Sequence, residues 1–346
     1  MGIFSKDLGV DLGTANVVIN ISGSEELVNE PSVVAMDRNN GRIIRVGREA
    51  KNMLDRTPGN LVAMHPLKDG VISDHEMTVK LLQAMFKNAD DSKLLKPKPR
   101  VVIGVPSSVT QVEERSVINA ALEAGARRVY LVESPLVAAL GAGLDISRAE
   151  GRMVVDIGAG TTDVAVLTMN AIAGSSSINI AGNAFDAAIV REVRHRYNMI
   201  IGMQTARDIK EKIGWAIPHE EEEPMTIAGL DVQTRIIKEQ KISSYDFVKV
   251  FGDLARQIGA EVQALLESTS PELVSDVAAT GITLTGGSSA MKGLAQAITE
   301  RTGIICTIAD QPDLCVAKGF SVILDKWLRN MREGTINTAR RRAMRK

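Results

Sequence analysis

The sequence predicts an α/β protein built from two similar domains. Two glycine-containing turns carry this prediction: "VDLGTANVVINI" (10–21) and "VVDIGAGTTDVAV" (154–166) each lie between apolar runs that are typical of strands. Each half of the chain also contains a strand, a turn and a helix in that order, at 101–125 and again at 281–303. With 346 residues, the chain is long enough for two domains that each bury a core.

In the first half, one helix is predicted in detail. Thr110 and Glu113 form a capping box at its start, and Gly125 ends it. Its apolar face is predicted to consist of Val117, Ile118, Ala121 and Leu122. The other expected elements are a hairpin at 7–21 turning at Gly13-Thr14, a hairpin at 31–47 turning at Asn40-Gly41, strands at 100–106 and 127–132, and a small-residue helix at 135–143.

The second half is expected to repeat this order with a longer insertion. The expected elements are a hairpin at 153–167, a helix from about Asn183, a polar segment at 203–242, a long helix at 244–268, and the strand, turn and helix of 281–303. The helix from Asn183 is expected to bury Phe185, Ala188, Ile189, Val193 and Tyr197. The acidic run "HEEEEP" (219–224) is predicted to be a solvated loop tip.

Composition narrows the function classes. No apolar run approaches the roughly 18 residues of a membrane-spanning helix, and the two cysteines predict a reducing, cytoplasmic setting. Aromatic residues are only 3% of the chain, which argues against stacking on nucleic acid, and no nucleic-acid partner is expected. The tail "RRRAMRK" (340–346) is either a solvated end or a contact for an anionic surface.

The two glycine turns are interpreted as phosphate-binding turns. Glycine lets another group approach the backbone closely, and successive N–H groups in a turn form an anion site. Thr14, Thr161 and Thr162 add hydroxyl groups. Asp11 and Asp156 enter the two turns at matching places, and carboxylates beside phosphate are expected to hold Mg²⁺.

Two further segments allow more than one interpretation. The Gly-Gly turn in "LTGGSSAMKG" (284–293) is either a ligand-binding turn or an ordinary loop between strand and helix. The segment "TARDIKEKIG" (205–214) is a helix that either faces a ligand or is a solvated surface helix with pairs such as Arg207 and Glu211.

Taken together, these motifs resemble the superfamily of actin, heat-shock chaperone ATPase domains and sugar kinases, and within it the bacterial actin-like MreB cell-shape family. The resemblance covers about residues 7–328. It rests on "DLGTAN", "NEPSVVA", "VGREAKNM", "HPLKDGVI", "VVIGVPSSVT", "DIGAGTTDVAV", "ELVSDV", "LTGGSSAMKGL" and "VAKGFSVILD".

The resemblance implies an actin-like ATPase fold with ATP or GTP and Mg²⁺ in a cleft between two facing domains. It places the phosphates at Gly13, Thr14, Ala15, Asn16, Gly158, Ala159, Gly160, Thr161 and Thr162, and the metal at Asp11 and Asp156 through water. It places the base and α-phosphate at Gly286, Gly287, Ser288, Ser289 and Met291, and the ribose near Arg207, Asp208, Ile209, Lys210 and Glu211. Two positions depart from the family: Ala159 replaces a usual Gly, and Arg207 stands where the family has its ribose-facing Glu, which leaves Glu211 as the alternative.

The resemblance also implies domain boundaries and a function. Domain I is expected at 1–145 with 325–346 (small subdomain about 33–65), and domain II at 146–324 (small subdomain about 183–242). The implied function is a nucleotide-dependent filament that organises cell shape and wall synthesis at the inner membrane face, with cell-shape and wall-synthesis membrane proteins as partners. The alternative is a paralogue with very slow or no hydrolysis that acts as a structural filament subunit. A small-molecule kinase is disfavoured because no Asp stands as a candidate base.

Hydrolysis and membrane contact give the last two expectations. The family has Glu just before Pro135, where this chain has Ser134, with Glu133 one place earlier. With Thr161 left to hold the attacking water, slow hydrolysis is predicted. The alternative is that the local backbone shifts and Glu133 serves as the base. Ile3, Phe4, Leu94 and Leu95 are candidate membrane anchors beside lysines, although Leu94 and Leu95 could instead close a small core.

Overall fold

The chain divides into two units, each described here by itself. The computed structural model describes residues 7–24, 26–54, 56–89 and 98–332. Unit 1 contains the described residues up to Arg148, Met169–Ile172 and those from Leu314 onward, and unit 2 contains Ala149–Thr168 and Ala173–Asp313. The chain therefore returns to unit 1 at Leu314, whereas the return was predicted at 325.

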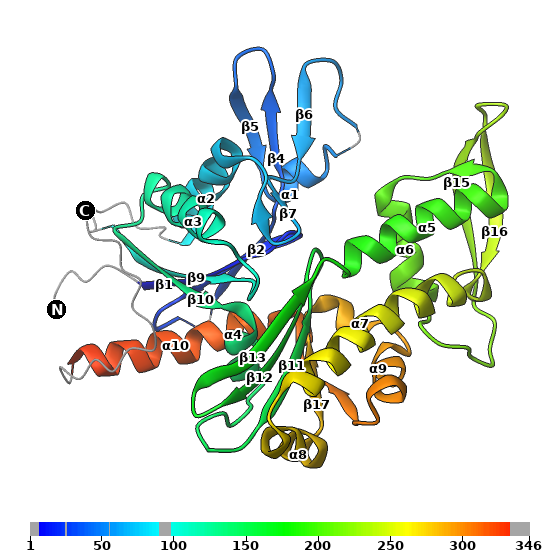
Figure 1. The fold of residues 1–346 in the computed structure, drawn as a ribbon. Coiled ribbons are helices and arrows are strands. Elements are labelled where there is room, and N and C mark those ends of the chain that lie inside the picture. Colours follow the sequence, from blue (N-terminus) through cyan, green and yellow to red (C-terminus); the bar gives the residue numbers. More distant parts are fainter. Residues whose placement is uncertain (1–6, 25, 55, 90–97, 333–346) are drawn as a thin grey trace. The chain divides into compact units, whose positions relative to one another are not determined.

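A five-stranded sheet forms the centre of unit 1 (Figure 1). Its order is β10-β9-β1-β2-β3, in which β1 and β2 form the predicted antiparallel hairpin and β9 and β10 run parallel to β1. The strands are β1 (Asp7–Leu12), β2 (Asn16–Ile21), β3 (Leu27–Pro31), β9 (Arg100–Val105) and β10 (Arg128–Glu133).

Alternation along β1 sends neighbouring side chains to opposite faces of this sheet. Leu8 and Val10 join the core under α2 and α3. On the other face, a Cβ on Gly9 would approach the Phe320 side chain of α10, so the glycine makes room for that ring. The remaining elements of unit 1 are α1 (Arg48–Lys51), α2 (His75–Ala89), α3 (Gln111–Glu123), α4 (Ser134–Gly141), α10 (Cys315–Arg332), β4 (Val34–Asp37), β5 (Arg42–Val46), β6 (Leu61–Met64), β7 (Leu67–Lys68) and β8 (Val71–Ile72).

Helices α4 and α10 touch backbone to backbone. A Cβ on Gly141 of α4 would lie 1.7 Å from the carbonyl oxygen of Cys315, and a Cβ on Gly319 of α10 would lie 1.9 Å from that of Val137. Only glycine permits this approach at either position. This contact fastens α10 to unit 1, to which the chain returns at Leu314.

Unit 2 contains a sheet of the same design. Its order is β13-β12-β11-β17-β18, in which β11 and β12 form an antiparallel hairpin and β17 and β18 run parallel to β11 (Figure 1). The strands are β11 (Arg152–Ile157), β12 (Thr162–Thr168), β13 (Ala171–Ile178), β17 (Ile282–Thr285) and β18 (Cys306–Ile308). The predicted repeat of hairpin and strand, turn and helix is therefore confirmed.

The core of unit 2 is built around three phenylalanines. The rings of Phe185 and Phe251 lie 5.6 Å apart, and those of Phe247 and Phe251 lie 6.0 Å apart. The surrounding elements are α5 (Gly182–Tyr197), α6 (Met203–Ile213), α7 (Val248–Ser268), α8 (Pro271–Thr280), α9 (Leu294–Thr302), β14 (Met199–Ile200), β15 (Pro224–Asp231), β16 (Ile237–Ser243) and the 3-10 turns Ser244–Asp246, Gly287–Ala290 and Pro312–Leu314. The polar segment predicted at 203–242 thus folds into α6 and the β15–β16 hairpin.

The predicted apolar face of α3 and the predicted solvation of the acidic run 219–224 are each correct only in part. The Thr110–Glu113 capping box is present at the start of α3, but Leu122 is 41% exposed and Ala120 is buried in its place. In the acidic run, Glu220 to Glu222 are exposed as predicted. The Glu223 carboxylate, in contrast, accepts hydrogen bonds from Lys292, so the solvated-tip prediction is wrong for this residue.

Candidate nucleotide site

Two backbone carbonyls in the turn of the first hairpin are bonded to Ser32. The Ser32 hydroxyl donates to the carbonyl of Gly13 at 2.6 Å, and the Ser32 N–H donates to the carbonyl of Ala15 at 2.8 Å. Because a trans peptide directs its C=O and N–H to opposite sides, the N–H of Thr14 points away from Ser32. A Cβ on Gly13 would lie 2.7 Å from the carbonyl oxygen of Asn16, so only glycine fits this position.

A helix end holds the turn of the second hairpin. The carbonyl of Gly158 accepts from the N–H of Gly182 at 3.1 Å, and that of Ala159 accepts from the N–H of Asn183 at 2.8 Å. By the same peptide geometry, the N–H groups of Ala159 and Gly160 point away from α5. Two successive N–H groups on one side of a turn form a surface for an anion.

The threonine hydroxyls have different roles. Thr162 is fully buried, and its hydroxyl donates to the carbonyl of Ile180 at 2.6 Å, so it supports the turn from behind. The Thr14 hydroxyl accepts from the N–H of Gly70 at 3.1 Å, which leaves its own proton available for donation.

The two matching acids have different surroundings. Burial raises the pKa of Asp11 to about 6, because a buried carboxylate loses its hydration. Asp156 instead accepts a hydrogen bond from the Thr285 hydroxyl at 2.8 Å through Oδ1. Within the described residues no three His, Cys, Asp or Glu side chains gather as a metal cluster, so a cation here needs water or phosphate among its ligands. Mg²⁺ takes such mixed ligand sets, and both carboxylates fit it.

The Gly-Gly turn joins the second hairpin within unit 2. Gly286 has φ +82°, and a Cβ there would lie 2.3 Å from the carbonyl oxygen of Ile157, at the end of β11. The Ser288 hydroxyl donates to the carbonyl of Gly158 at 2.7 Å, while the buried Ser289 donates to the carbonyl of Gly286. The predicted members Gly286 to Ser289 therefore lie beside the phosphate turn, and Met291 follows them at the end of the short 3-10 helix.

Helix α6 brings two cations to a buried acid that the sequence analysis did not identify. Asp186 of α5 is fully buried; its Oδ1 lies 2.7 Å from Nζ of Lys210, and its Oδ2 lies 3.5 Å from Nε of Arg207. Lys210 also donates to the carbonyl of Gly182 at 3.0 Å. Burial lowers the pKa of Lys210, and the charge of Asp186 opposes that shift. Asp186 interrupts the apolar face of α5 directly after Phe185, which is the signal that could have revealed it.

The other predicted ribose residues separate into buried and exposed ones. Ile209 is fully buried in the core, so its side chain does not face a ligand. Asp208 accepts from the side chain of Gln204, and Glu211 is exposed. The predicted pairing of Arg207 with Glu211 is replaced by the contact of Arg207 with Asp186.

The candidate residues for hydrolysis lie at the end of β10 and in the second turn. Glu133 is the N-cap of α4, and Ser134 is its first residue and is buried, with its Oγ 3.0 Å from the position of a Cβ on Gly104. The Thr161 hydroxyl lies 3.2 Å from Oδ2 of Asp163. Glu133 and Ser134 are thus successive residues at the start of α4, and their roles in hydrolysis stay a prediction.

The membrane candidates Ile3, Phe4, Leu94 and Leu95 lie outside the described residues, as does the basic tail 340–346. Among the described helices, none combines the length and apolar character required to cross a bilayer.

Solved structures define the class of protein. The crystal structure of MreB 5 of Spiroplasma citri bound to AMPPNP matches this chain with a TM-score of 0.89 at 35% identity, covering 96% of this chain and 99% of that one. The MamK double helical filament matches in fold with a TM-score of 0.80 at 24% identity, covering 93% and 99%. This chain therefore has the actin-like fold, as predicted.

Sequence relatives give the family. A family model described as MreB/Mbl protein matches residues 5–332. The cell shape-determining protein Mbl of Bacillus cereus is 42% identical over 323 residues, covering 93% of this chain and 97% of that protein. The cell shape-determining protein MreB of Escherichia coli is 42% identical over 328 residues, covering 94% of each. The chain belongs to the MreB/Mbl family.

Proposed function

We propose that this chain binds ATP with Mg²⁺ and assembles with copies of itself into filaments that organise cell shape. The observation that carries the nucleotide proposal is the arrangement of the two turns, in which bonded carbonyls direct backbone N–H groups to the opposite side. The MreB5 structures with AMPPNP and ADP support an adenine nucleotide. The cell shape-determining relatives support the role in shape.

The proposed contacts follow the sequence prediction, with the adjustments described above. The phosphates bind at 13–16 and 158–161, with Thr162 as support, and the base and α-phosphate bind at Gly286–Met291. Asp11 and Asp156 hold Mg²⁺ together with water and phosphate. The ribose lies on the side of α6 that carries Arg207, Lys210 and Glu211.

Sedimentation and electron microscopy of the purified full chain test this function. With Mg²⁺ and ATP the protein is expected to pellet and to show filaments, and without nucleotide it is expected to remain in the supernatant. The same assays with GTP in place of ATP show which nucleotide is preferred. A chain that binds neither nucleotide, or that phosphorylates a small molecule, would contradict the proposal.

The proposal also places this protein at the inner membrane face, with wall-synthesis proteins as its partners. This placement is supported by the apolar pairs Ile3-Phe4 and Leu94-Leu95, which stand beside lysines in the sequence. In a liposome flotation assay, Leu94→Ser/Leu95→Ser combined with deletion of residues 1–6 is expected to reduce flotation. Deletion of 340–346 is measured separately, because its cations could compensate. Equal flotation of parent and variant would remove this part of the proposal.

A further inference from the structure

An aromatic and charged cluster lies directly after the Gly-Gly turn of unit 2. We define the Trp215 cluster as Trp215, His219, Glu223 and Lys292. The whole chain has only two Trp and three Tyr, so an aromatic stack at this place is a notable local concentration. The Trp215 and His219 rings stack with centroids 4.6 Å apart and planes 9° apart, and Tyr245 packs on His219 at 4.9 Å.

Lys292 contacts two side chains of this cluster. Its Nζ lies 2.7 and 2.6 Å from the two carboxylate oxygens of Glu223 and 5.3 Å from the centre of the Trp215 ring. The indole N–H of Trp215 donates to the same carboxylate at 3.0 Å. These bonds, led by the one from Lys292, hold the pKa of Glu223 below its usual range. The carboxylate therefore stays charged at neutral pH.

The same lysine joins two segments that flank the proposed base and ribose site. Its backbone carbonyl accepts from the N–H of Ala216 at 2.8 Å, and its Nζ lies 3.3 Å from the carbonyl of Lys212 in the last turn of α6. A cation is favourable at a helix C-terminus. Lys292 itself follows Met291, the last residue of the Gly-Gly turn. The turn and α6 are thus fastened together through one side chain and one backbone bond.

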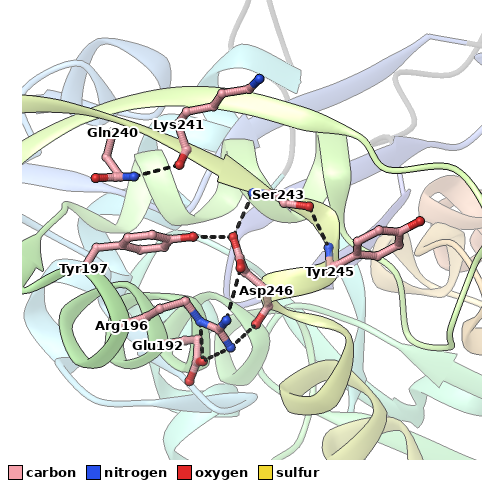
Figure 2. Close-up of polar contacts among 8 residues, drawn as sticks. All are labelled: Glu192, Arg196, Tyr197, Gln240, Lys241, Ser243, Tyr245 and Asp246. Atoms are coloured by element: carbon pink, nitrogen blue, oxygen red, sulfur yellow. Dashed lines mark hydrogen bonds and ion pairs between the residues drawn. The ribbon is translucent and has the colours of Figure 1, made fainter.

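The other side of the cluster is fixed to the base of the β15–β16 hairpin. Ser244 is fully buried; its Oγ lies 2.7 Å from Nε2 of His219 and accepts from the N–H of Glu223 at 3.0 Å. Figure 2 shows how this region is anchored: Asp246 accepts from the Tyr197 hydroxyl at 2.5 Å and from the Ser243 N–H at 2.8 Å. With this side fixed, a loss of the Lys292 contacts loosens the turn rather than the hairpin.

We propose that Lys292 and Glu223 are positioning residues that hold the Gly286–Met291 turn at the distance from α6 where the base and ribose of a nucleotide bind. This inference rests on the proposed nucleotide function and deepens it. By this inference, the Lys292–Glu223 ion pair strengthens the binding of the base and ribose without contacting them, because it positions the turn that binds them. It also makes Trp215 a reporter of nucleotide binding in this unit.

Affinity measurements on four proteins test the assignment: the full-length parent, Lys292→Met, Lys292→Arg and the exposed control Glu222→Gln. Lys292→Met is expected to weaken ATP binding about five- to tenfold, since a partly exposed ion pair and a cation–π contact are lost together. Lys292→Arg keeps the charge and is expected to restore most of the affinity. Inhibition constants for pyrophosphate, which lacks the α-phosphate assigned to this turn, are expected to be equal in all four proteins when measured by displacement of a fluorescent ATP analogue.

Tryptophan emission gives a second readout in a Trp327→Phe background, where Trp215 is the only tryptophan. ATP is expected to change this emission in the Trp327→Phe protein, and much less when Lys292→Met is added. The inference is overturned if Lys292→Met binds ATP like the parent, or if its affinities for ATP and for pyrophosphate fall by the same factor. If the parent protein binds no nucleotide, both the proposed function and this inference are wrong. If the parent binds ATP but Lys292→Met gives either of the contrary results above, only the inference is wrong.

Discussion

The two hairpins proposed to bind phosphate share a sequence pattern but differ in the contacts that support their turns. Ser32 alone bonds two carbonyls of the first turn, whereas the second turn is bonded by the N-terminus of α5 and by Ser288. Asp156 receives a hydrogen bond from Thr285, while desolvation raises the pKa of Asp11 to about 6. The second turn is therefore pre-organised for an anion, and the first carries a charge that its surroundings penalise. A similar motif in two places thus does not imply equal energetic roles.

The largest expected effect concerns the hydrolytic water. Ser134→Glu should raise the rate of phosphate release about 10²-fold or more, because a positioned acid–base group contributes roughly 10²–10⁴-fold. Ser134→Gln is the matched control in size and should stay at the slow rate of the parent. Glu133→Ala should also match the parent. If Glu133→Ala abolishes phosphate release instead, Glu133 is the base and the assignment of Ser134 is wrong.

Next in size is the loss of Mg²⁺-dependent binding. Asp11→Ala and Asp156→Ala should each weaken ATP binding by a factor of about 100, since removing one partner of a desolvated charge contact costs roughly 2–5 kcal/mol. Calorimetry with and without Mg²⁺ measures this, and circular dichroism shows whether the fold survives. Unchanged affinity in either variant would refute its role as a metal ligand.

The pH dependence of the free energy of unfolding should distinguish Asp11 from Asp156. The folded-state pKa of Asp11 lies above its unfolded value of 3.8, so its ionisation destabilises the fold as pH rises from about 4 to about 6. Asp11→Asn should therefore raise the free energy of unfolding of the nucleotide-free protein by about 1–3 kcal/mol at pH 7. The gain should disappear near pH 4. Asp156→Asn should bring no such gain, because the Asp156 carboxylate accepts a hydrogen bond from Thr285. If chemical denaturation shows equal gains in stability for the two variants, the contrast between the two acids is wrong.

The smallest effect is expected at Ala159. This residue is not among the non-glycine residues with positive φ, so its methyl group is compatible with the turn. Ala159→Gly should leave ATP affinity within about twofold and lower the free energy of unfolding by roughly 0.4–1 kcal/mol, because glycine has more freedom in the unfolded chain. A large gain in affinity would show that the methyl group obstructs the phosphate.

Sequence reasoning identified the parts of the site that local patterns encode. Both hairpins, the capping box of Thr110 and the Gly-Gly turn follow from turn residues and alternation within a few positions. It missed the partners that tertiary folding supplies, such as the bond between Ser288 and Gly158, which are 130 residues apart. It also missed Asp186, because a single acid on an apolar face has no spacing rule that predicts its buried cations.

The same limit explains two of the incorrect details, those at Leu122 and Glu223. Leu122 matched the helical period of α3, but only packing decides whether Ala120 or Leu122 lies against the sheet. The acidic run suggested uniform solvation because like charges repel, and nothing in its sequence marked Glu223 as the partner of Lys292. In both cases the deciding contact comes from another element.

The backbone contact between α4 and α10 has a consequence for the order of folding. Unit 1 contains β1, yet its α4 packs on α10, which is synthesised after all the residues of unit 2. The first unit to be translated is therefore not the first that can be completed, whereas unit 2 has all its residues by Asp313. A chain interrupted before Cys315 would hold a complete unit 2 and an unfinished unit 1, with Gly141 uncovered.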